Sequence, residues 1–427
     1  MRAIVVVLAV ILIFSLPAGA NVVKVSLDGA IDLALENNLD LQAKRKELDI
    51  ATADIKIANK LQNPQVQSNV LIGKITTGNA SQAGIMFPVE TFKRGVRKKA
   101  AIARKKAIEN QIRQTEHELK IKVMRAYFDV LYYKSVEDIM IERKNLFEDL
   151  REIAFDKSKS GKNFKIDSLQ ADIRYKKQLI ELNRSKAELM NAQFEFNKTI
   201  NALTDEKMYD TQESSLFEDD LTILDIQLPP YKTIEVAALK YSYSLKITDN
   251  NIEQYNQEYV LARRQRIPNI MIGGGFAWQT KYQGEGSNWP GAFVGGGFDL
   301  PVLYSYRPDI DKAATILEKT KMDKISFENK LKITLKQNYN NFKYARQNMD
   351  YYKDILKESD EILKTSTDLY KTGGISLINL IWTENNHQAI LNEYLTAMEF
   401  YYGVYLNMMH NIGHDILLEE DIFEDEN

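Results

Sequence analysis

The sequence of 427 residues contains no cysteine. This absence excludes thiol catalysis, CxxC redox chemistry and zinc sites built on cysteine ligands. It also excludes an acylated N-terminal cysteine, so any membrane attachment must come from the fold itself. The formal net charge is only −3, which gives no reason to expect nucleic acid as a partner.

Long apolar runs are also scarce, and the one that matters lies at the N-terminus. Arg2 is followed by an apolar run over residues 3–16 and by the small residues that precede residue 21. This pattern predicts a signal peptide over residues 1–20, cleaved after Ala20. The alternative is an N-terminal membrane anchor, but the run is shorter than the roughly 20 residues that span a bilayer. We therefore expect an exported chain with no helical means of sitting in a membrane.

Proline and glycine are missing from two long stretches of the chain. There are nine prolines, none of them between Pro88 and Pro229 or after Pro308. The only glycine between residues 96 and 228 is Gly161. Because proline breaks helix interiors, these stretches permit very long helices.

The residues within these stretches favour helices. Arg104–Lys159 is dense in Glu, Lys, Arg, Leu, Ile and Ala, which are good helix formers. We predict long helices over residues 92–160 and 308–371, followed by helices over 164–202 and 376–412. A helix from residue 94 to residue 160 would measure about 100 Å, which fits a coiled coil or a tube wall and no compact domain.

Glycines and aromatic residues gather in segments that alternate like strands. Strands are predicted over residues 269–279 and 291–301, joined by a polar, glycine-rich loop, and a fainter hairpin over 65–74 and 82–89. The hairpin over 269–279 and 291–301 has one oily face and one face of small or polar residues. The small or polar face includes Gly273, Gly275, Gly295 and Gly297, which fit strand curvature or an open bore equally. The residues predicted to face a membrane from the oily side of the second hairpin are Ile270, Ile272, Phe276, Trp278, Val294 and Phe298.

These hairpins allow two interpretations. Strands of about ten residues match the length of a tilted membrane strand. The alternative is a pair of hairpins in a soluble α+β domain. The helices that flank them are far too long for such a domain, so we favour membrane strands.

The chain also matches itself at two offsets. At 204, Pro64 meets Pro268; at 212, Gly161 meets Gly373 and Ile200 meets Ile412. We therefore predict an internal duplication. Its parts are a first repeat over residues 21–202, an equatorial linker over 203–231, a second repeat over 232–413 and an acidic tail over 414–427.

Four strands per chain predict an oligomer. They cannot close a barrel, and an open edge facing lipid would leave N–H and C=O groups without partners. Two copies would supply 8 strands and three copies 12, and more strands leave a wider lumen. Counting alone prefers three copies only modestly.

With these features, the mature sequence resembles the TolC-like outer membrane efflux proteins. The resemblance rests on the duplication and on the prolines that enter the strands. It also rests on the segments FPVETFKRG and LPVLYSY and on the two turns KSGKNFKIDSLQA and YKTGGISLINLIWTE. The motif YYGVYLNMMHNIG is similar to the family's closing helix.

The resemblance implies a mixed α+β membrane protein. A trimer would form a 12-stranded transmembrane β-barrel, with four strands per chain, continued by a long α-helical periplasmic barrel. It would sit in the outer membrane of a Gram-negative-type cell, surrounded by lipid. It would be an exit duct of a tripartite efflux or type I secretion system: a passive channel, gated at its periplasmic tip. Its partners would be a periplasmic adaptor protein and an inner-membrane transporter that together open it.

The resemblance also assigns residues at the periplasmic tip. The adaptor would dock on the two glycine turns, at Lys159, Gly161, Lys371, Gly373 and Gly374. The gate residues would be Asp167, Tyr370, Asn379 and Trp382, of which Asp167 and Tyr370 match positions whose hydrogen bonds hold the entrance shut. Asp167 could equally cap its turn, and Tyr370 could equally be packed between helices.

The tip departs from the family pattern at several positions. Gly374 and Ile375 stand where the best-known member has an arginine bonded into the gate. Asn379 and Trp382 stand where it has two aspartates that ring the constriction. These differences predict a gate that is weaker or differently built, with cation binding in doubt.

Two other functions are compatible with parts of the sequence. A secreted coiled-coil scaffold or adhesin without a pore explains the helices but not the oily strands. An enzyme would need a site, yet there is no GxxxxGK[ST] phosphate loop. His410 and His414 could hold a metal on one helical face, but no carboxylate completes the set. We therefore expect no catalytic residue, metal or cofactor.

Overall fold

The computed structural model describes residues 21–70, 80–159, 164–202, 207–217, 224, 226–279, 289–299 and 301–413. The predicted signal peptide, the acidic tail, Gly161 and His414 lie outside these ranges. The chain divides into two compact units. One contains Met1–Leu39, Glu118–Gln227 and Asn340–Asn407, and the other contains the remaining residues.

Four long helices account for nearly half of the chain. The two longest are α3 (Arg94–Ser158, 65 residues) and α7 (Arg307–Thr372, 66 residues), where residues 92–160 and 308–371 were expected. The other two are α4 (Phe164–Thr199) and α8 (Leu377–Ile412). Pro308 is the second residue of α7, where a missing N–H costs nothing because no intrahelical partner exists there. Among the residues that the structure describes, no helix has the length and apolar character to cross a bilayer.

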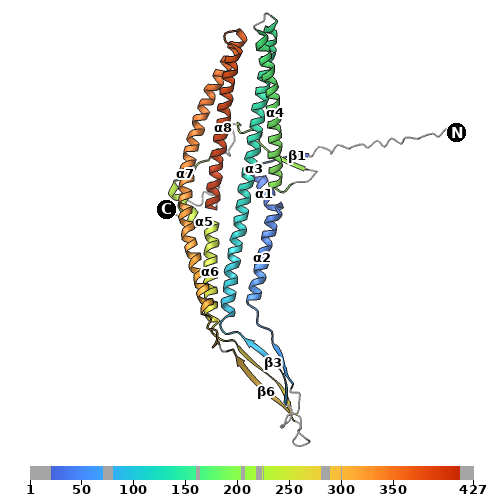
Figure 1. Ribbon diagram of the computed structural model, residues 1–427, viewed down its shortest axis with the longest axis vertical. Coiled ribbons are helices and arrows are strands. Elements are labelled where there is room, and N and C mark those ends of the chain that lie inside the picture. Colours follow the sequence, from blue (N-terminus) through green and yellow to red (C-terminus); the bar gives the residue numbers. More distant parts are fainter. Residues whose placement is uncertain are drawn as a thin grey trace, which may run out of the picture. The chain divides into compact units, whose positions relative to one another are not determined.

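Aromatic rings hold the first unit together. The rings of Phe128 and Tyr402 stack with centroids 4.6 Å apart, and those of Phe342 and Tyr401 lie 4.7 Å apart. These contacts join α3 to α8 and α7 to α8. Figure 1 shows α3 beside α4 and α7 beside α8 over the upper part of the view. The apolar faces that the helical periodicity predicts therefore do become the core of this unit.

The first unit also contains a small sheet that the sequence did not predict. Strand β1 (Asn21–Val25), which precedes α1 (Leu27–Asn37), pairs in parallel with β4 (Lys207–Thr211). β1 begins directly after the expected cleavage site. The residues assigned only to a linker therefore supply a strand. Lys134 of α3 holds it, because its Nζ lies 2.9 Å from the carboxylate of Asp210.

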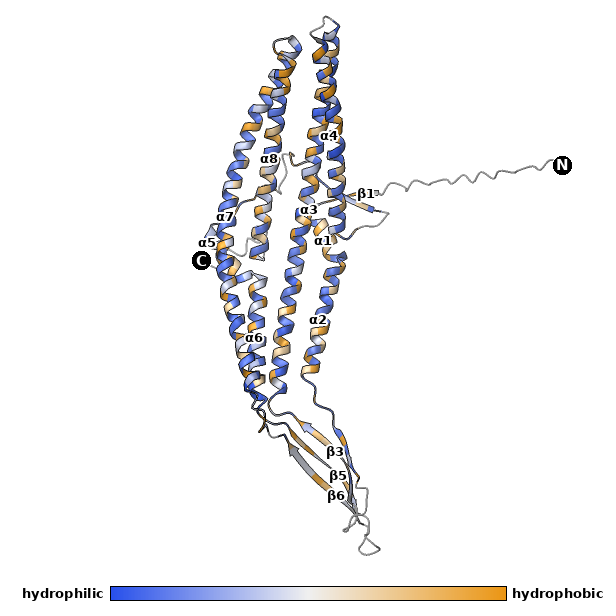
Figure 2. Ribbon diagram, viewed as in Figure 1, coloured by the Kyte–Doolittle hydropathy of each residue, from blue (hydrophilic) through white to orange (hydrophobic). Residues whose placement is uncertain are grey.

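The second unit combines shorter helices with a sheet. Its helices are α2 (Leu39–Ala58), α5 (Tyr231–Tyr241) and α6 (Tyr243–Arg264), together with the first parts of α3 and α7. Figure 2 shows hydrophobic residues recurring along the helices among hydrophilic ones, as expected for helices with one packed face.

The sheet has four strands, all antiparallel. They are β2 (Gln65–Asn69), β3 (Ala80–Val89), β5 (Ile270–Gln279) and β6 (Trp289–Phe298), in the order β2-β3-β5-β6. The two expected hairpins are thus one continuous sheet, because β3 pairs with β5 from Ala80↔Gln279 to Val89↔Ile270. Within the described residues, β2 and β6 each have only one neighbouring strand.

Two glycines of β5 are required by how closely the strands approach. A Cβ placed on Gly275 would lie 2.1 Å from the carbonyl oxygen of Ala83, and one on Gly273 would lie 2.2 Å from that of Ile85. Gly297 has open space instead. The close approach of β3 and β5 explains why glycine is needed at positions 273 and 275 better than an open bore does.

Candidate functional site

The tip of the first unit is a hydrophobic cluster contributed by all four long helices. Its buried members come from the end of α3, the start of α4, the end of α7 and the start of α8. They are Phe147, Leu150, Ala154, Ala171, Tyr370, Leu377, Leu380 and Ile381. The tip cluster, as we call these residues, therefore ties the α3–α4 pair to the α7–α8 pair.

Tyr370 lies at the centre of the tip cluster and is only 2% exposed. Lys157 of α3 covers its ring, with Nζ 4.3 Å from the ring centroid, and donates a hydrogen bond of 2.7 Å to the Tyr370 carbonyl oxygen. The Tyr370 hydroxyl has no hydrogen-bond partner among the described residues. Burial, and then the negative charge of Asp167, raise the pKa of this hydroxyl.

Asp167 is close enough to Tyr370 to act on it electrostatically, but no hydrogen bond joins them in the single chain. Asp167 lies in the first turn of α4, where a carboxylate is favoured by the helix dipole. The gate hydrogen bonds expected of Asp167 and Tyr370 therefore stay a prediction. In the single chain, the Tyr370 ring packs where the two helix pairs meet.

The other two predicted gate residues lie elsewhere. Asn379 and Trp382 are one turn apart on α8, and both are exposed; 67% of Trp382 is accessible. The backbone N–H of Asn379 donates to the Ser376 hydroxyl at 3.3 Å, as at a helix N-terminus. The four predicted gate residues thus separate into a buried tyrosine with a nearby acid, and an exposed pair on α8.

The second glycine turn has a well-defined helix-ending geometry. Gly373 has φ +85°, and its N–H donates to the carbonyl of Tyr370 at 3.1 Å. The N–H of Gly374 donates to the carbonyl of Leu369 at 2.7 Å. Together these two bonds are a Schellman motif, which needs a left-handed residue and therefore favours glycine.

The two lysines predicted to dock an adaptor have acidic neighbours one turn away. Nζ of Lys159 lies 2.8 Å from the Asp156 carboxylate, and Nζ of Lys371 lies 3.9 Å from that of Asp368. All four side chains are more than half exposed. The turns therefore present charge of both signs.

Next to the tip cluster lies a buried ion pair that was not predicted from the sequence. Arg143 of α3 contacts the carboxylate of Glu384 in α8 through two guanidinium nitrogens, and its Nη2 also donates to Asn385 at 3.3 Å. Glu384 is 2% exposed. The signal for it was present, because Glu384 follows Leu377, Leu380 and Ile381 at helical spacing on the buried face of α8.

A second polar contact connects α7 and α8. The His387 ring lies 3.0 Å from the Ser359 hydroxyl and 3.4 Å from the Asp360 carboxylate. With the Arg143–Glu384 pair, it fixes the register of α8 against both long helices. Among the described residues, no group of three His, Asp or Glu side chains is placed to hold a metal ion.

The six strand residues predicted to face a membrane all lie on the surface of the second unit. Ile270, Ile272, Phe276, Trp278, Val294 and Phe298 are each exposed by more than a third. Such a run of exposed apolar side chains is unusual for a face that meets water. It is the feature of this unit that most needs a partner.

Comparison with known proteins agrees with the resemblance seen in the sequence. Residues 30–201 match the Outer membrane efflux protein family. No curated protein sequence matches the chain.

Solved structures match nearly the whole fold. The outer-membrane channel OprN matches with a TM-score of 0.72 and 14% identity, over 91% of this chain and 90% of that one. The CmeC outer membrane channel of Campylobacter jejuni matches with a TM-score of 0.70 and 16% identity, over 91% and 85%. The open state of the MtrE outer membrane channel of Neisseria gonorrhoeae matches with a TM-score of 0.67 and 14% identity, over 91% and 88%. The sequence match over residues 30–201 and the fold match over 91% of the chain confirm the resemblance to the TolC-like outer membrane efflux proteins.

Proposed function

We propose that this protein is an outer-membrane exit duct, a passive channel that continues from a membrane barrel into a helical periplasmic tunnel. The observation that carries the proposal is the four-stranded sheet, which has an exposed apolar face and, in the described part of the chain, two edges without a further strand. Such a sheet is not stable alone in water or in lipid, because its edge N–H and C=O groups need partners. A closed barrel made from several copies removes both problems.

Three copies fit this requirement best. Three sheets of four strands would give a 12-stranded barrel, which leaves a lumen, whereas eight strands would fill their own interior. OprN, CmeC and MtrE are described as outer membrane channels, and the fold is theirs. We infer a homotrimer in the outer membrane of a Gram-negative-type cell, surrounded by lipid at the strands.

The helices of the first unit carry the surfaces that such a trimer needs. On α7, the exposed apolar residues Tyr344, Tyr351, Ile355, Ile362 and Leu369 are spaced by seven or four residues. On α4, the exposed residues Ile166, Leu169, Ile173 and Ile180 are spaced by three, four and seven residues. Heptad spacing of this kind is the seam of a coiled coil. These stripes support a tube wall in which each chain packs against its neighbours.

The tip cluster is the gate in this proposal. It holds the α7–α8 pair against the α3–α4 pair, with Tyr370 between them and the Arg143–Glu384 pair behind. Opening would separate the helix pairs, which is a two-state rearrangement that a docked partner can bias. The partners would be a periplasmic adaptor, at the turns of Lys159–Gly161 and Lys371–Gly374, and an inner-membrane transporter that supplies the energy.

The proposal is tested by asking whether the protein is a membrane pore or a scaffold. Purified full-length protein would be reconstituted into liposomes loaded with a small dye, and oligomers would be sized on gels with and without heating. We expect dye release and a heat-sensitive trimer from outer-membrane fractions. A soluble oligomer that never associates with lipid and releases no dye would favour the scaffold or adhesin instead.

A further inference from the structure

Where the strands end and the long helices begin, the second unit carries an unusual mixture of exposed apolar and cationic side chains. We name it the junction collar. It lies between β3 and α3, between α6 and β5, and between β6 and α7. Its members are Phe92, Arg94, Arg264, Arg266, Val302, Leu303, Tyr304 and Arg307.

Hydrogen bonds hold the segments of the junction collar in one place. Arg264 donates to the Phe92 carbonyl oxygen, and Nε of Arg266 donates to the Ser305 carbonyl oxygen at 3.1 Å. The Thr91 hydroxyl donates to the Pro268 carbonyl oxygen at 2.6 Å. The collar is therefore a built surface formed by three chain segments that are far apart in sequence.

The apolar part of the collar continues the oily face of the strands. Val89, Ile270 and Phe298, at or near the strand ends, are exposed. Beyond them, Phe92 is 73% exposed and Leu303 is completely exposed. Phe92 follows β3, a central strand of the sheet, so a missing strand neighbour at the sheet edge does not explain its exposure.

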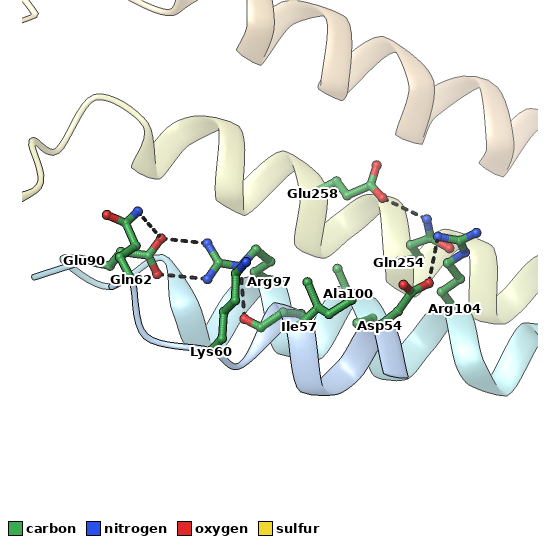
Figure 3. A pocket seen from close by; sticks show the side chains of 12 residues that line it. Asp54, Ile57, Lys60, Gln62, Glu90, Arg97, Ala100, Arg104, Gln254 and Glu258 are labelled. Carbon is green, nitrogen blue, oxygen red and sulfur yellow. Dashed lines mark hydrogen bonds and ion pairs between the residues drawn. The ribbon is translucent and has the colours of Figure 1, made fainter. Parts of the chain in front are cut away.

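The cations of the junction collar have few acidic partners. Among the described residues, Arg94, Arg264 and Arg266 have no acidic group within ion-pair distance, and Arg307 reaches Asp311 only at 3.9 Å. Arg97, three residues beyond Arg94, is different. Figure 3 shows its guanidinium facing Glu90, with two hydrogen bonds of 2.7 and 3.0 Å.

An apolar band followed at once by guanidinium groups fits the interface of a bilayer. Acyl chains meet the first and phosphates meet the second, and basic residues near anionic lipid each contribute about 1 kcal/mol of attraction. Arginine suits phosphate because its planar fork can donate two parallel hydrogen bonds. A water-filled lumen would give the exposed Phe92 and Leu303 no partner.

We propose that the junction collar binds anionic phospholipid of the periplasmic leaflet. Acyl chains would lie against Phe92 and Leu303, and phosphate groups against Arg94 and Arg307. This inference rests on the proposed function, because it assigns the sheet to the outer membrane. It adds a lipid of defined charge to that function.

The test is lipid binding by the purified full-length protein in neutral detergent, followed by native mass spectrometry. Short-chain phosphatidylglycerol, phosphatidylcholine and inorganic phosphate would be titrated separately. We expect phosphatidylglycerol to bind at least tenfold more tightly than phosphatidylcholine. Its affinity should fall as salt is raised, because exposed charges are screened over about 10 Å at 0.1 M salt.

Matched variants locate the effect. Arg94→Gln with Arg307→Gln should lower the affinity for phosphatidylglycerol by up to about 25-fold, at about 5-fold for each cation. Lys120→Gln with Lys343→Gln removes two exposed charges elsewhere on the same helices and should change nothing. Leu303→Ser should lower the affinity for both lipids equally. Because the Leu303 side chain is fully exposed, the change should not disturb the packing of the chain. Arg94→Gln alone should lower the affinity about 5-fold if the double variant does not fold.

Three results would overturn the inference. Equal affinity for both lipids would show that the anionic headgroup is not recognised. An equal loss of affinity in the lysine control would show that the binding site is not the junction collar. Competition by inorganic phosphate at the same concentration as lipid would identify a free-phosphate site. In all three cases a protein that still releases dye from liposomes keeps the proposed function, whereas one that never inserts loses both.

Discussion

Nζ of Lys157 donates to the backbone carbonyl of Tyr370 at 2.7 Å while lying 4.3 Å from the centre of the same tyrosine ring. One side chain of α3 thus fixes both the backbone and the ring of the last turns of α7. The contact lies at the tip, where the two helix pairs meet. It connects the packing of the cluster to the state of the proposed gate.

Tyr370 should stabilise the fold through its ring and not through its hydroxyl. Tyr370→Phe removes a buried hydroxyl that has no partner within the described chain, so we expect the thermal midpoint to stay the same or to rise. Tyr370→Ala leaves a cavity, with an expected loss of about 3–5 kcal/mol, as for other buried aromatic residues. Thermal unfolding of the two variants checks this. Equal destabilisation by both would mean that the hydroxyl has a partner after all.

The buried ion pair should be more sensitive to losing one partner than to losing both. Glu384→Gln leaves Arg143 charged and enclosed, and we expect a loss of about 3–5 kcal/mol. Replacing both, as in Arg143→Met with Glu384→Leu, should recover much of it. Chemical denaturation of the single and double variants gives the coupling energy.

The Lys198–Glu195 pair supplies the control for this cycle. Both of its side chains are two-thirds exposed, so removing either should change stability by less than about 1 kcal/mol. A single Glu384→Gln variant as mild as this surface control would show that the buried pair is not desolvated.

Asp129 of α3 should make stability depend on pH. Burial, opposed by Arg125 and reinforced by Glu399, raises the pKa of its carboxyl to about 6. The folded protein therefore keeps a proton that the unfolded chain releases at about pH 3.9. Stability from this group is present below about pH 4 and is lost as the pH rises to about 6. Comparing thermal midpoints from pH 4 to 8 for the wild type and Asp129→Asn checks it.

The difference between these proteins gives the decisive sign. Asp129→Asn should unfold at a higher temperature than the wild type above pH 6 and lose this part of the pH dependence. The same pH dependence in the wild type and in Asp129→Asn between pH 4 and 6 would show that the pKa of the Asp129 carboxyl does not change on folding.

Two glycines of the sheet should respond in opposite ways. Gly275→Ala places a methyl group 2.1 Å from the Ala83 carbonyl oxygen, so β3 and β5 cannot keep their spacing. Gly297→Ala meets nothing within 4 Å. We expect the first variant to lose the oligomer in outer-membrane fractions and the second to keep it, as judged on unheated gels. Two equally normal oligomers would mean that the strands have room to move apart.

Much of this fold was predictable because its signals are local. The absence of proline and glycine predicted α3 and α7 to within two residues at each end. The alternation of apolar residues predicted β5 to within one residue and β6 to within three residues at each end. The mixed helical and stranded class and the resemblance to the outer membrane efflux proteins are confirmed. The trimer and the 12-stranded barrel stay predictions, because a single chain contains only four of the strands.

What the sequence did not reveal depends on contacts between distant residues. The β1–β4 pair joins Asn21 to Lys207, and each strand has only five residues. The motif identified Tyr370, but only the packing of four helices shows that its hydroxyl is buried with no partner among the residues that the structure describes. Arg143 and Glu384 are 241 residues apart, and neither suggests the other.

The most direct test of the central claim is single-channel conductance of the purified full-length protein in a planar bilayer, with wild type, Tyr370→Phe and Tyr370→Ala side by side. The account predicts discrete conductance steps in all three. The steps should be small in the wild type and Tyr370→Phe and clearly larger in Tyr370→Ala, because only the last removes the ring from the tip cluster. Equal steps in all three would contradict a gate at Tyr370, and no steps from inserted protein would contradict the channel itself.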